Sequence, residues 1–332
     1  MKEGKMSFLR DKSVLITGGT GSFGKAFVKK VLEDDQVSKL VVFSRDELKQ
    51  FEMAEVINSP KLRYFLGDVR DYQRLLRATD GIDVIVHAAA MKQIPASEYN
   101  PMEAIKTNVI GAENIVNVSI ENGIQRVVAL STDKAANPAN LYGATKLCSD
   151  KLMIAGNVLA GSRNTKFSAV RYGNVLGSRG SVIPFFLDKA KSGSIPITDE
   201  RMTRFWLTIQ EGVKFVLDSF DRMYGGEIFV PKIPSFKVTD VARVVCPGVP
   251  TQVIGIRPGE KLHEVMITED DSHSTYEFDE YFAIISPALK LLGVYDEIGS
   301  KVSEGFRFSS DNNKIWHSDE SFLKVLKDNG IL

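Results

Sequence analysis

The sequence predicts an α/β protein built on a doubly wound parallel sheet, followed by a smaller C-terminal lobe. Two observations carry this prediction. Short, almost wholly apolar runs alternate with longer amphipathic segments through the first half of the chain. Such runs suit strands that crossover helices bury on both faces. A glycine-rich turn also joins the first apolar run to the first amphipathic segment, as at the first crossover of sheets of this kind.

Each predicted strand is bounded by turn or helix signals. Asn100 and Pro101 open one intervening helix, because Asn suits the N-cap and Pro the first helical position. After Asn174 the chain becomes rich in Gly, Pro and Ser, so we place a first domain at residues 1–175 and a second, interleaved lobe at 176–332. The expected strands are 14–16, 40–43, 62–66, 84–87, 127–130 and 169–172, and the expected helices of the second half are 182–191 and 210–223.

The composition is that of an ordinary globular protein. Its 332 residues are 43% hydrophobic, and Lys plus Arg equals Asp plus Glu at 42 each, so no net field attracts nucleic acid or an anionic membrane. No apolar run approaches the roughly 18 residues of a membrane span, and we expect a cytoplasmic protein. The two cysteines, Cys148 and Cys246, suit buried small hydrophobes.

The four histidines predict no metal site. They are scattered along the chain, and His263-Glu264 lacks the second His that a zinc-binding helix carries four residues on. His87 closes an apolar run, so we expect a packed, hydrogen-bonded core residue there.

The segment after the first strand has the pattern of a dinucleotide-binding turn. Gly18 permits a tight turn, Gly21 lets the backbone approach a pyrophosphate, and Gly24 lets the next helix pack on the strand. Glycines alone carry little weight, but here strand and helix flank them, and the helix N–H groups would face the phosphates. The expected phosphate-binding residues are Gly18, Thr20, Gly21, Ser22, Phe23 and Gly24.

The end of the second predicted strand indicates which dinucleotide binds. An NAD site places an Asp or Glu about 20 residues after the glycine turn, on the ribose hydroxyls. Ser44 and Arg45 stand there instead, and with Lys49 they match the 2′-phosphate of NADP. A solvated charge cluster around Asp46 is the alternative, and capping a helix is an alternative role for Asp68. The other expected cofactor-binding residues are Asp68, Val69, Ala88, Lys92, Tyr142 and Lys146.

The fifth predicted strand runs into residues that suit proton transfer. Thr132 follows that strand, and Tyr142 lies four residues before Lys146, so the two share one face of a helix. A Lys ammonium beside a phenol, together with the positive nicotinamide, would lower the pKa of Tyr142 toward the operating pH. Tyr142 would then take a hydroxyl proton while a hydride leaves for the cofactor.

At this point the chain resembles the extended short-chain dehydrogenase/reductase superfamily, in which a Ser or Thr, a Tyr and a Lys have this arrangement. It is further similar to the inverting UDP-N-acetylglucosamine 4,6-dehydratases of pseudaminic acid synthesis. Asp133-Lys134 stands where retaining sugar dehydratases usually carry Asp-Glu, and related membrane-bound dehydratases tend to have Met in place of Tyr142. Gln93 departs from the pattern, since relatives often have His there. The stretches that carry the similarity are 43–49, 131–138, 141–146, 170–175, 195–199, 202–205 and 255–261.

The resemblance implies a mechanism. Tyr142 takes the C4 hydroxyl proton as the C4 hydride passes to NADP, Lys134 removes the C5 proton, and Asp133 protonates the departing C6 hydroxyl. Hydride then returns to C6 and C5 is inverted. Lys134 needs its ordinary pKa of about 10.4 lowered, and we expect desolvation and the positive charge of Lys146 and the nicotinamide to do so. A salt-bridged turn pair is the alternative role of Asp133 and Lys134.

The expected substrate is a UDP-linked sugar, and the expected assembly is a homo-oligomer, a dimer or hexamer. A nucleotide-sugar 4-epimerase or a retaining 4,6-dehydratase would use the same turn and Tyr-Lys pair, but Lys134 in place of Glu argues against both. A non-catalytic NADP-sensing protein should have lost Tyr142 or Lys146, and neither is lost. The expected substrate-binding residues are Lys134, Asn174, Arg179, Arg204, Arg257 and Glu260.

Overall fold

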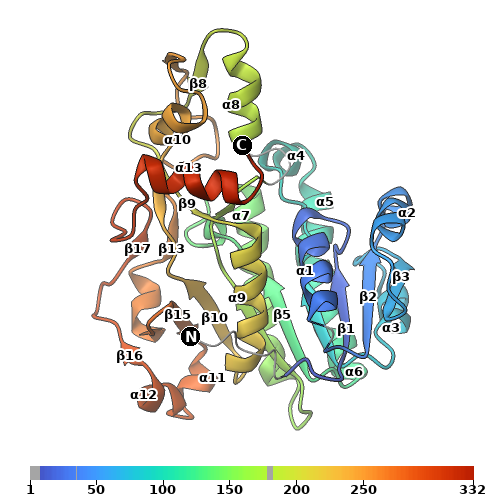
Figure 1. The fold of residues 1–332 in the computed structure, drawn as a ribbon. Coiled ribbons are helices and arrows are strands. Elements are labelled where there is room, and N and C mark those ends of the chain that lie inside the picture. Colours follow the sequence, from blue (N-terminus) through green and yellow to red (C-terminus); the bar gives the residue numbers. More distant parts are fainter. Residues whose placement is uncertain (1–7, 35, 178–181) are drawn as a thin grey trace.

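The computed structural model describes residues 8–34, 36–177 and 182–332, and a ten-stranded sheet forms its centre (Figure 1). Its parallel part begins with β1 (Ser13–Thr17) and continues on both sides of that strand, which confirms the predicted doubly wound sheet. The strands of this part run in the order β3 (Leu62–Leu66), β2 (Lys39–Ser44), β1, β4 (Val84–His87), β5 (Arg126–Leu130), β6 (Lys166–Val170) and β10 (Glu227–Pro231).

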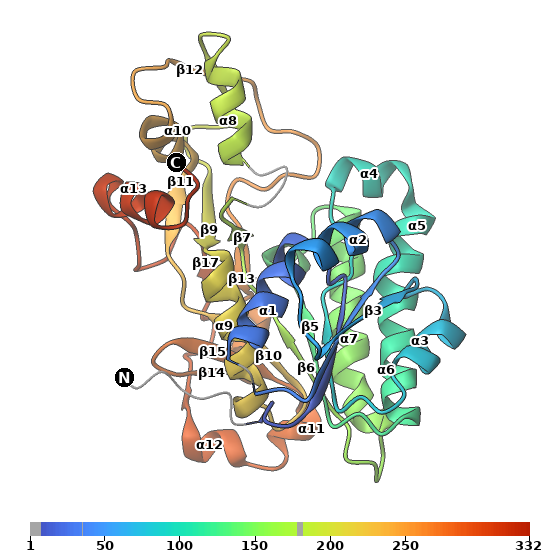
Figure 2. The same cartoon turned by 45° about the vertical axis from the view of Figure 1, so that its right-hand side comes forward.

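Helices cover both faces of this sheet, because side chains of successive strand residues point to opposite faces. Val14 and Ile16 belong to one apolar core, whereas Leu15 between them belongs to another. Figure 2 shows α1 (Ser22–Glu33) and α9 (Ile209–Arg222) beside each other on one side of the strands, and α6 (Gly111–Glu121) and α7 (Leu141–Leu159) together on the other. The remaining helices of the first half are α2 (Glu47–Val56), α3 (Tyr72–Ala78), α4 (Ile94–Tyr99) and α5 (Pro101–Ile105).

The second half of the chain adds strands to the main sheet that the sequence did not predict. β10 pairs in parallel with β6, and β15 (Tyr281–Ile285) pairs antiparallel with β10. Beyond β15 follow β14 (Thr275–Glu277) and β16 (Ser300–Lys301), both antiparallel. The residues after Asp270 therefore complete the sheet on the side opposite β3.

A smaller lobe stands above the carboxyl ends of the parallel strands, at the top of Figures 1 and 2. Its own core holds Trp206, Phe236 and Phe322, whose rings lie 4.4–5.6 Å apart. Strands β7 (Asn174–Val175), β9 (Thr203–Leu207) and β11 (Ser235–Lys237) form its main sheet. Its other elements are α8 (Val182–Ala190), β8 (Ile195–Ile197), α10 (Val238–Val245), β12 (Thr251–Val253) and α13 (Asp319–Asp328).

Three local expectations are corrected. The sixth strand ends at Val170, so Arg171 and Tyr172 follow it rather than belong to it. α5 begins at Pro101 as predicted, but the Asn100 side chain donates to the Ala96 carbonyl and does not cap the helix. Cys148 is exposed on α7, because it lies on the solvent side of that helix.

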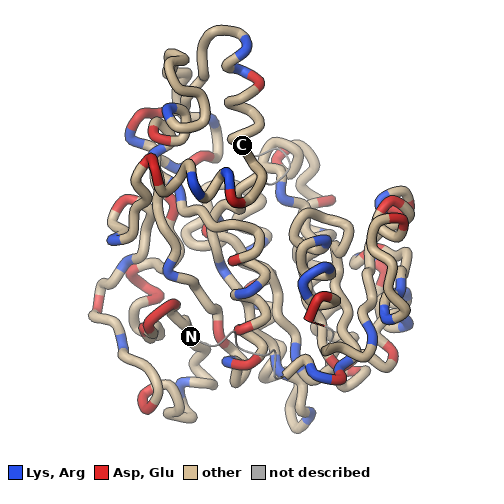
Figure 3. Tube along the Cα trace, in the orientation of Figure 1, with Lys and Arg blue, Asp and Glu red and all other residues tan. Residues whose placement is uncertain are grey.

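Charge is spread over the whole fold. Figure 3 shows basic and acidic residues interspersed along the trace. Among the residues that the structure describes, no helix is both long and apolar enough to cross a bilayer. Within the same residues, no cluster of three or more His, Cys, Asp or Glu side chains is arranged to hold a metal ion.

Candidate active site

The glycine turn lies where the strand order reverses, between β1 and β4, which is the ligand-binding point of doubly wound sheets. Gly18 has φ +66°, and a Cβ there would stand 2.9 Å from the backbone of Ala89 after β4. A Cβ on Gly24 would stand 2.4 Å from the Gly19 carbonyl oxygen. Only glycine fits either position. Gly21 is the N-cap of α1 and no side chain caps that helix, so its first-turn N–H groups remain available to phosphates.

The residues expected to select NADP gather at the end of β2. Thr20 Oγ1 and Ser44 Oγ lie 2.8 Å apart, which joins the glycine turn to β2. The Arg45 side chain is two-thirds exposed and lies 3.6 Å from the carboxylate of Asp68. Lys49 is paired with Asp46 at 2.5 Å. An exposed cation thus stands beside the turn, with its partner carboxylate on the neighbouring loop.

Asp68 does not cap a helix. Its carboxylate accepts hydrogen bonds from the Arg70 backbone and guanidinium, and Asp71 is the N-cap of α3. Val69 is buried against Gly111, whose Cβ would come within 2.8 Å of Val69. The Ala88 N–H donates to Thr17 Oγ1, which fixes the loop after β4 beside the glycine turn.

The residues expected to transfer protons follow the end of β5. Thr132 Oγ1 donates to Asp133 Oδ1 at 2.9 Å, and Lys134 Nζ donates to the same oxygen at 3.0 Å. The Thr132 side chain is also hydrogen-bonded to the Tyr142 phenol. Asp133 is completely buried, and its other oxygen, Oδ2, has no hydrogen-bond partner among the described residues. An acid, an amine and a phenol therefore meet within one hydrogen-bonded group.

A close helix contact holds this group together. The Asn140 side chain caps α7 by accepting from the Gly143 N–H at 2.8 Å. A Cβ on Gly143 would stand 2.2 Å from the Lys134 carbonyl oxygen, so α7 lies directly on the turn that carries Asp133 and Lys134. This contact fixes the position of Tyr142 relative to Lys134.

The electrostatics of the site differ from those expected. Burial acts to lower the pKa of Lys134, but the carboxylates of Asp133 and Glu264 outweigh it and hold this pKa above its ordinary value. Burial raises the pKa of Asp133, and the Glu264 carboxylate adds to that rise. The expected lowering of the Lys134 pKa is therefore wrong for the ligand-free chain, because two carboxylates rather than Lys146 surround its ammonium group.

Tyr142 is corrected in the same way. Burial raises the pKa of Tyr142 to about 12, and the cation that opposes this rise is Lys134 rather than Lys146. Burial also lowers the pKa of Lys146, whose nearest carboxylate is Asp150. Lys146 is buried one turn beyond Tyr142 along α7.

His87 is a core residue, as expected. Its Nδ1 lies 2.9 Å from Thr17 Oγ1, and the ring is 1% exposed. Burial and the charge of Lys146 lower the pKa of His87 to about 3, so the ring is neutral.

The expected substrate-binding residues differ in their burial and in their hydrogen-bond partners. Asn174 Oδ1 is buried without a hydrogen-bond partner among the described residues. Arg257 is exposed and pairs with Glu260 at 2.9 Å, in a turn tied to α7 by the Asn140 side chain, which donates to the Gly259 carbonyl. Arg179 lies outside the described residues.

Arg204 is turned toward the backbone of its own lobe. Its guanidinium donates to the carbonyls of Thr203, Lys261 and Leu262 at 2.7–3.1 Å. These bonds use donors that an expected diphosphate contact would need, so in this geometry Arg204 mainly holds the segment around residues 261–262.

Two further residues of the site were not identified from the sequence. Glu264 is 3% exposed, and its Oε1 lies 3.4 Å from Lys134 Nζ. Lys261 Nζ donates to the Ala136 carbonyl at 2.8 Å, next to the turn that carries Asp133 and Lys134. The sequence around His263-Glu264 indicated only that a zinc motif is incomplete there. Glu264 lies more than a hundred residues after Lys134, and no local pattern indicates that the two side chains are in contact.

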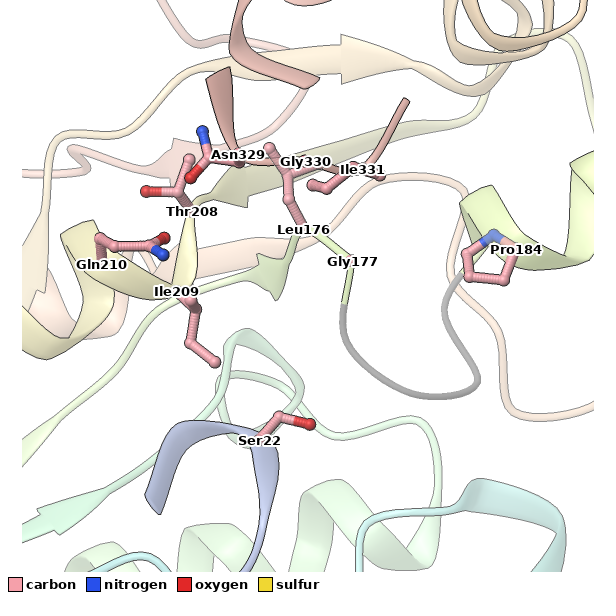
Figure 4. A pocket seen from close by; sticks show the side chains of 10 residues that line it. All are labelled: Ser22, Leu176, Gly177, Pro184, Thr208, Ile209, Gln210, Asn329, Gly330 and Ile331. Atoms are coloured by element: carbon pink, nitrogen blue, oxygen red, sulfur yellow. The ribbon is translucent and has the colours of Figure 1, made fainter. Parts of the chain in front are cut away.

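A cavity of about 360 Å³ opens beside the glycine turn. Figure 4 shows Ser22, at the beginning of α1, on one side of this cavity, with Asn329 and Gly330 on the other and Thr208 and Gln210 at its margin. The small lobe and the glycine turn, called the glycine cradle below, thus line the same cavity.

A glycine cradle where the strand order reverses, a hydrogen-bonded Thr-Tyr pair and a buried Lys one turn along α7 define the class of extended short-chain dehydrogenases/reductases. Within that class, residues 14–286 match the family model described as polysaccharide biosynthesis protein, and the chain belongs to this family.

Relatives of known name are similar along most of the chain. A Campylobacter jejuni protein named UDP-N-acetylglucosamine 4,6-dehydratase (inverting) is 56% identical over 95% of this chain and 97% of its own length. A Rickettsia canadensis protein named UDP-glucose 4-epimerase is 41% identical over 82% of this chain and 83% of its own. The X-ray structure of Pen from Bacillus thuringiensis matches with a TM-score of 0.87 and 35% identity, over 97% of this chain and 99% of that one.

Proposed function

We propose that this protein is an NADP-dependent UDP-N-acetylglucosamine 4,6-dehydratase that inverts C5 of the sugar. The observation that carries the proposal is the contact of Lys134 Nζ with Asp133 Oδ1 at 3.0 Å, next to the Thr132-Tyr142 pair. A base and an acid for elimination are thus side by side. The name of the 56% identical Campylobacter jejuni relative supports the same activity.

The cradle residues fit a dinucleotide. The uncapped beginning of α1 and the glycines at positions 18, 21 and 24 would hold the pyrophosphate, with Thr20, Ser22 and Phe23 around it. Arg45, Ser44 and Lys49 would hold the 2′-phosphate of NADP, because Ser44 and Arg45 rather than a carboxylate stand at the end of β2, and Asp46 just beyond caps α2. Asp68, Val69, Ala88 and Lys92 would line the rest. When bound, the nicotinamide supplies a hydride acceptor for C4 and a hydride donor for C6.

Tyr142 serves the first step as proton acceptor for the C4 hydroxyl. Its raised pKa of about 12 means that the phenolate is rare until cations gather around it. Lys134 already opposes the rise, and Lys146 lies one turn away on α7. Thr132, bonded to the phenol, fixes the direction of the proton transfer.

Lys134 and Asp133 serve the elimination as a pair. A proton that moves from Lys134 Nζ to Asp133 along their 3.0 Å hydrogen bond leaves a neutral amine and a carboxylic acid. The amine then takes the C5 proton, acidified by the C4 ketone, and the acid gives its proton to the C6 oxygen, which leaves as water. Both side chains return to the ion pair. Burial raises the pKa of Asp133, which favours this transfer, whereas the carboxylates that raise the pKa of Lys134 oppose it until the substrate binds.

The small lobe would bind the UDP moiety. Asn174 offers an unpartnered buried oxygen, and Arg257 with Glu260 offers a fork of donors and a carboxylate in the turn that Asn140 ties to α7. Arg179 completes the proposed set, whereas Arg204 would act indirectly, through its hydrogen bonds to the carbonyls of Lys261 and Leu262. We also propose a cytoplasmic homo-oligomer, dimer or hexamer, that acts at the first step of pseudaminic acid synthesis.

A 4-epimerase is the second candidate, because the Rickettsia canadensis relative carries that name. An epimerase needs the phenol and the cofactor but no base for C5. The buried amine-acid pair next to Tyr142 therefore favours dehydration.

The test is incubation of the protein and NADP with UDP-N-acetylglucosamine in deuterated water, followed by NMR. We expect a 4-keto-6-deoxy sugar with deuterium at C5 and inverted C5 configuration. Retention at C5 would indicate the retaining dehydratase, and interconversion of C4 epimers without loss of water would indicate the epimerase. Either outcome would overturn the proposal.

A further inference from the structure

Glu264 is a buried carboxylate whose placement is determined by the fold rather than by solvent. It directly precedes β13 (Val265–Ile267), and both its backbone N–H and its backbone carbonyl form hydrogen bonds with Ser310. The Glu264 N–H donates to Ser310 Oγ at 2.9 Å, and the Ser310 N–H donates to the Glu264 carbonyl at 2.8 Å. Arg204, bonded to the carbonyls of Lys261 and Leu262, fixes the chain just before it. The carboxylate is therefore held in one position.

That position faces Lys134. Glu264 Oε1 lies 3.4 Å from Lys134 Nζ and 3.8 Å from Arg204 Nε, while Oε2 lies 4.0 Å from Lys261 Nζ. Oε2 has no hydrogen-bond partner among the described residues, although burial of a carboxylate without full compensation is costly. A buried charge that is incompletely satisfied is a feature of sites where charge serves chemistry.

We infer that Glu264 is a positioning residue for the proposed C5 base: it holds the Lys134 amine between two carboxylates and stabilises the ammonium that forms when Lys134 takes the C5 proton. This inference rests on the proposed function for its chemistry, but its electrostatic part concerns the free chain. Asp133 exchanges a proton with Lys134, whereas Glu264 stays ionised throughout, because burial is outweighed by Lys134, Arg204 and Lys261, which keep its pKa low.

The charged and titratable groups around the Lys134 amine come from several elements. Asp133 and Glu264 raise the pKa of Lys134, whereas Arg204 lowers it. Lys92, Lys261 and Tyr142 also sense the charge of Lys134. Among the described residues, removal of the Glu264 charge leaves the Asp133 carboxylate beside Lys134 to balance the cations Lys92, Arg204 and Lys261, so the pKa of Lys134 must fall.

The first test uses the chain without substrate. Competitive acylation with acetic anhydride, read for Lys134 by mass spectrometry across pH, gives the pH midpoint of the amine. We expect Glu264→Gln to move this midpoint to lower pH by about one to three units, the range of effect of a neighbouring opposite charge. Glu264→Asp, which retains the charge, should restore most of the difference. Glu269→Gln removes a carboxylate from an exposed position five residues on and should leave the midpoint unchanged.

The second test uses catalysis. In Glu264→Gln the acid limb of the kcat profile should move to lower pH, and plateau kcat should fall with little change in KM. A merely structural role would instead lower the melting temperature without moving either pH midpoint. An unchanged Lys134 midpoint in both Glu264 variants, with folding intact by circular dichroism, overturns the inference even if the parent dehydrates its substrate. If Glu264→Gln shifts the Lys134 midpoint but the parent protein does not dehydrate its substrate, the ion pairing is supported and the proposed function is refuted.

Discussion

At the scale of single residues, the neighbourhood of Lys134 decides when it can act as a base. Burial alone would lower its pKa, but carboxylates at 3.0 and 3.4 Å keep the amine protonated. A lysine in this state is a base only after it passes its proton to Asp133. The ion pair and the catalytic role, which the sequence presents as alternatives, are therefore compatible.

Tyr142 and Arg45 have roles that single substitutions can separate. Tyr142→Phe removes the proposed acceptor of the C4 proton and keeps the ring. We expect NADP binding to be unchanged and turnover to fall by at least about a hundredfold, since general base catalysis contributes about 10²–10⁴. Stopped-flow absorbance of the reduced cofactor would measure this. The control is Tyr99→Phe, at a phenol that is 87% exposed; parental turnover in Tyr142→Phe would rule out the assignment.

Arg45→Asp tests the cofactor preference. The change removes the proposed partner of the 2′-phosphate and supplies a carboxylate for a ribose diol. We expect NADP affinity to fall about tenfold to a hundredfold, as for loss of a charged hydrogen bond of about 1.5–3 kcal/mol, and NAD affinity to rise. Isothermal titration calorimetry measures both. Arg77→Asp, in the last turn of α3, makes the same charge change and should alter neither affinity. Equal loss of both cofactors in Arg45→Asp would contradict NADP selection.

Much of the candidate site was predictable at this scale because its residues lie in local patterns. Gly18, Gly21 and Gly24 occupy one turn, and Tyr142 and Lys146 occupy one helix face. Glu264 was not predictable, because only the packing of the segment before β13 against the turn at Asp133 brings it to Lys134. The predicted lowering of the Lys134 pKa was wrong for the same reason, because Glu264 helps to raise that pKa.

At the scale of elements, the site depends on how α7 lies on the turn after β5. Gly143 faces the Lys134 carbonyl so closely that no larger residue fits without displacement. Gly212, on α9, offers a useful contrast, since a Cβ there would meet its nearest atom at an ordinary 3.5 Å. Both glycines lie in helices without positive φ, so helix propensity favours Ala equally at both.

Gly143→Ala should therefore damage catalysis out of proportion to stability. We expect α7 to shift away from the turn, so that kcat falls by about tenfold or more while NADP affinity is retained. Gly212→Ala should keep parental kcat and equal or greater thermal stability. Steady-state kinetics and thermal unfolding of the two variants check this. Parental kcat in Gly143→Ala would show that the contact does not position Tyr142.

At the scale of the whole molecule, one apolar core joins the two halves of the sequence. It includes Val14 and Ile16 of β1, Phe205 of β9 and Phe229 of β10. The alternation of strands and helices predicted the first half, because parallel strands buried on both faces read as apolar runs. β10 and β15 were missed, since they join the sheet only by pairing with strands far away in the sequence.

This shared core predicts a single unfolding transition. Both tryptophans, Trp206 and Trp316, lie in the second half of the sequence, so their fluorescence reports that half, whereas far-ultraviolet circular dichroism reports all helices and strands. We expect the two signals to give the same midpoint in urea. A fluorescence midpoint clearly below the dichroism midpoint would mean that the small lobe unfolds independently.

The account depends most on Lys134 as the amine that removes the C5 proton, and the rate of product formation by Lys134→Ala measures this directly. We predict that the variant binds NADP as the parent does and forms no 4-keto-6-deoxy sugar from UDP-N-acetylglucosamine, while Lys151→Ala, at an exposed lysine of α7, keeps the parental rate. Dehydration by Lys134→Ala at the parental rate, observed by NMR, would contradict the account.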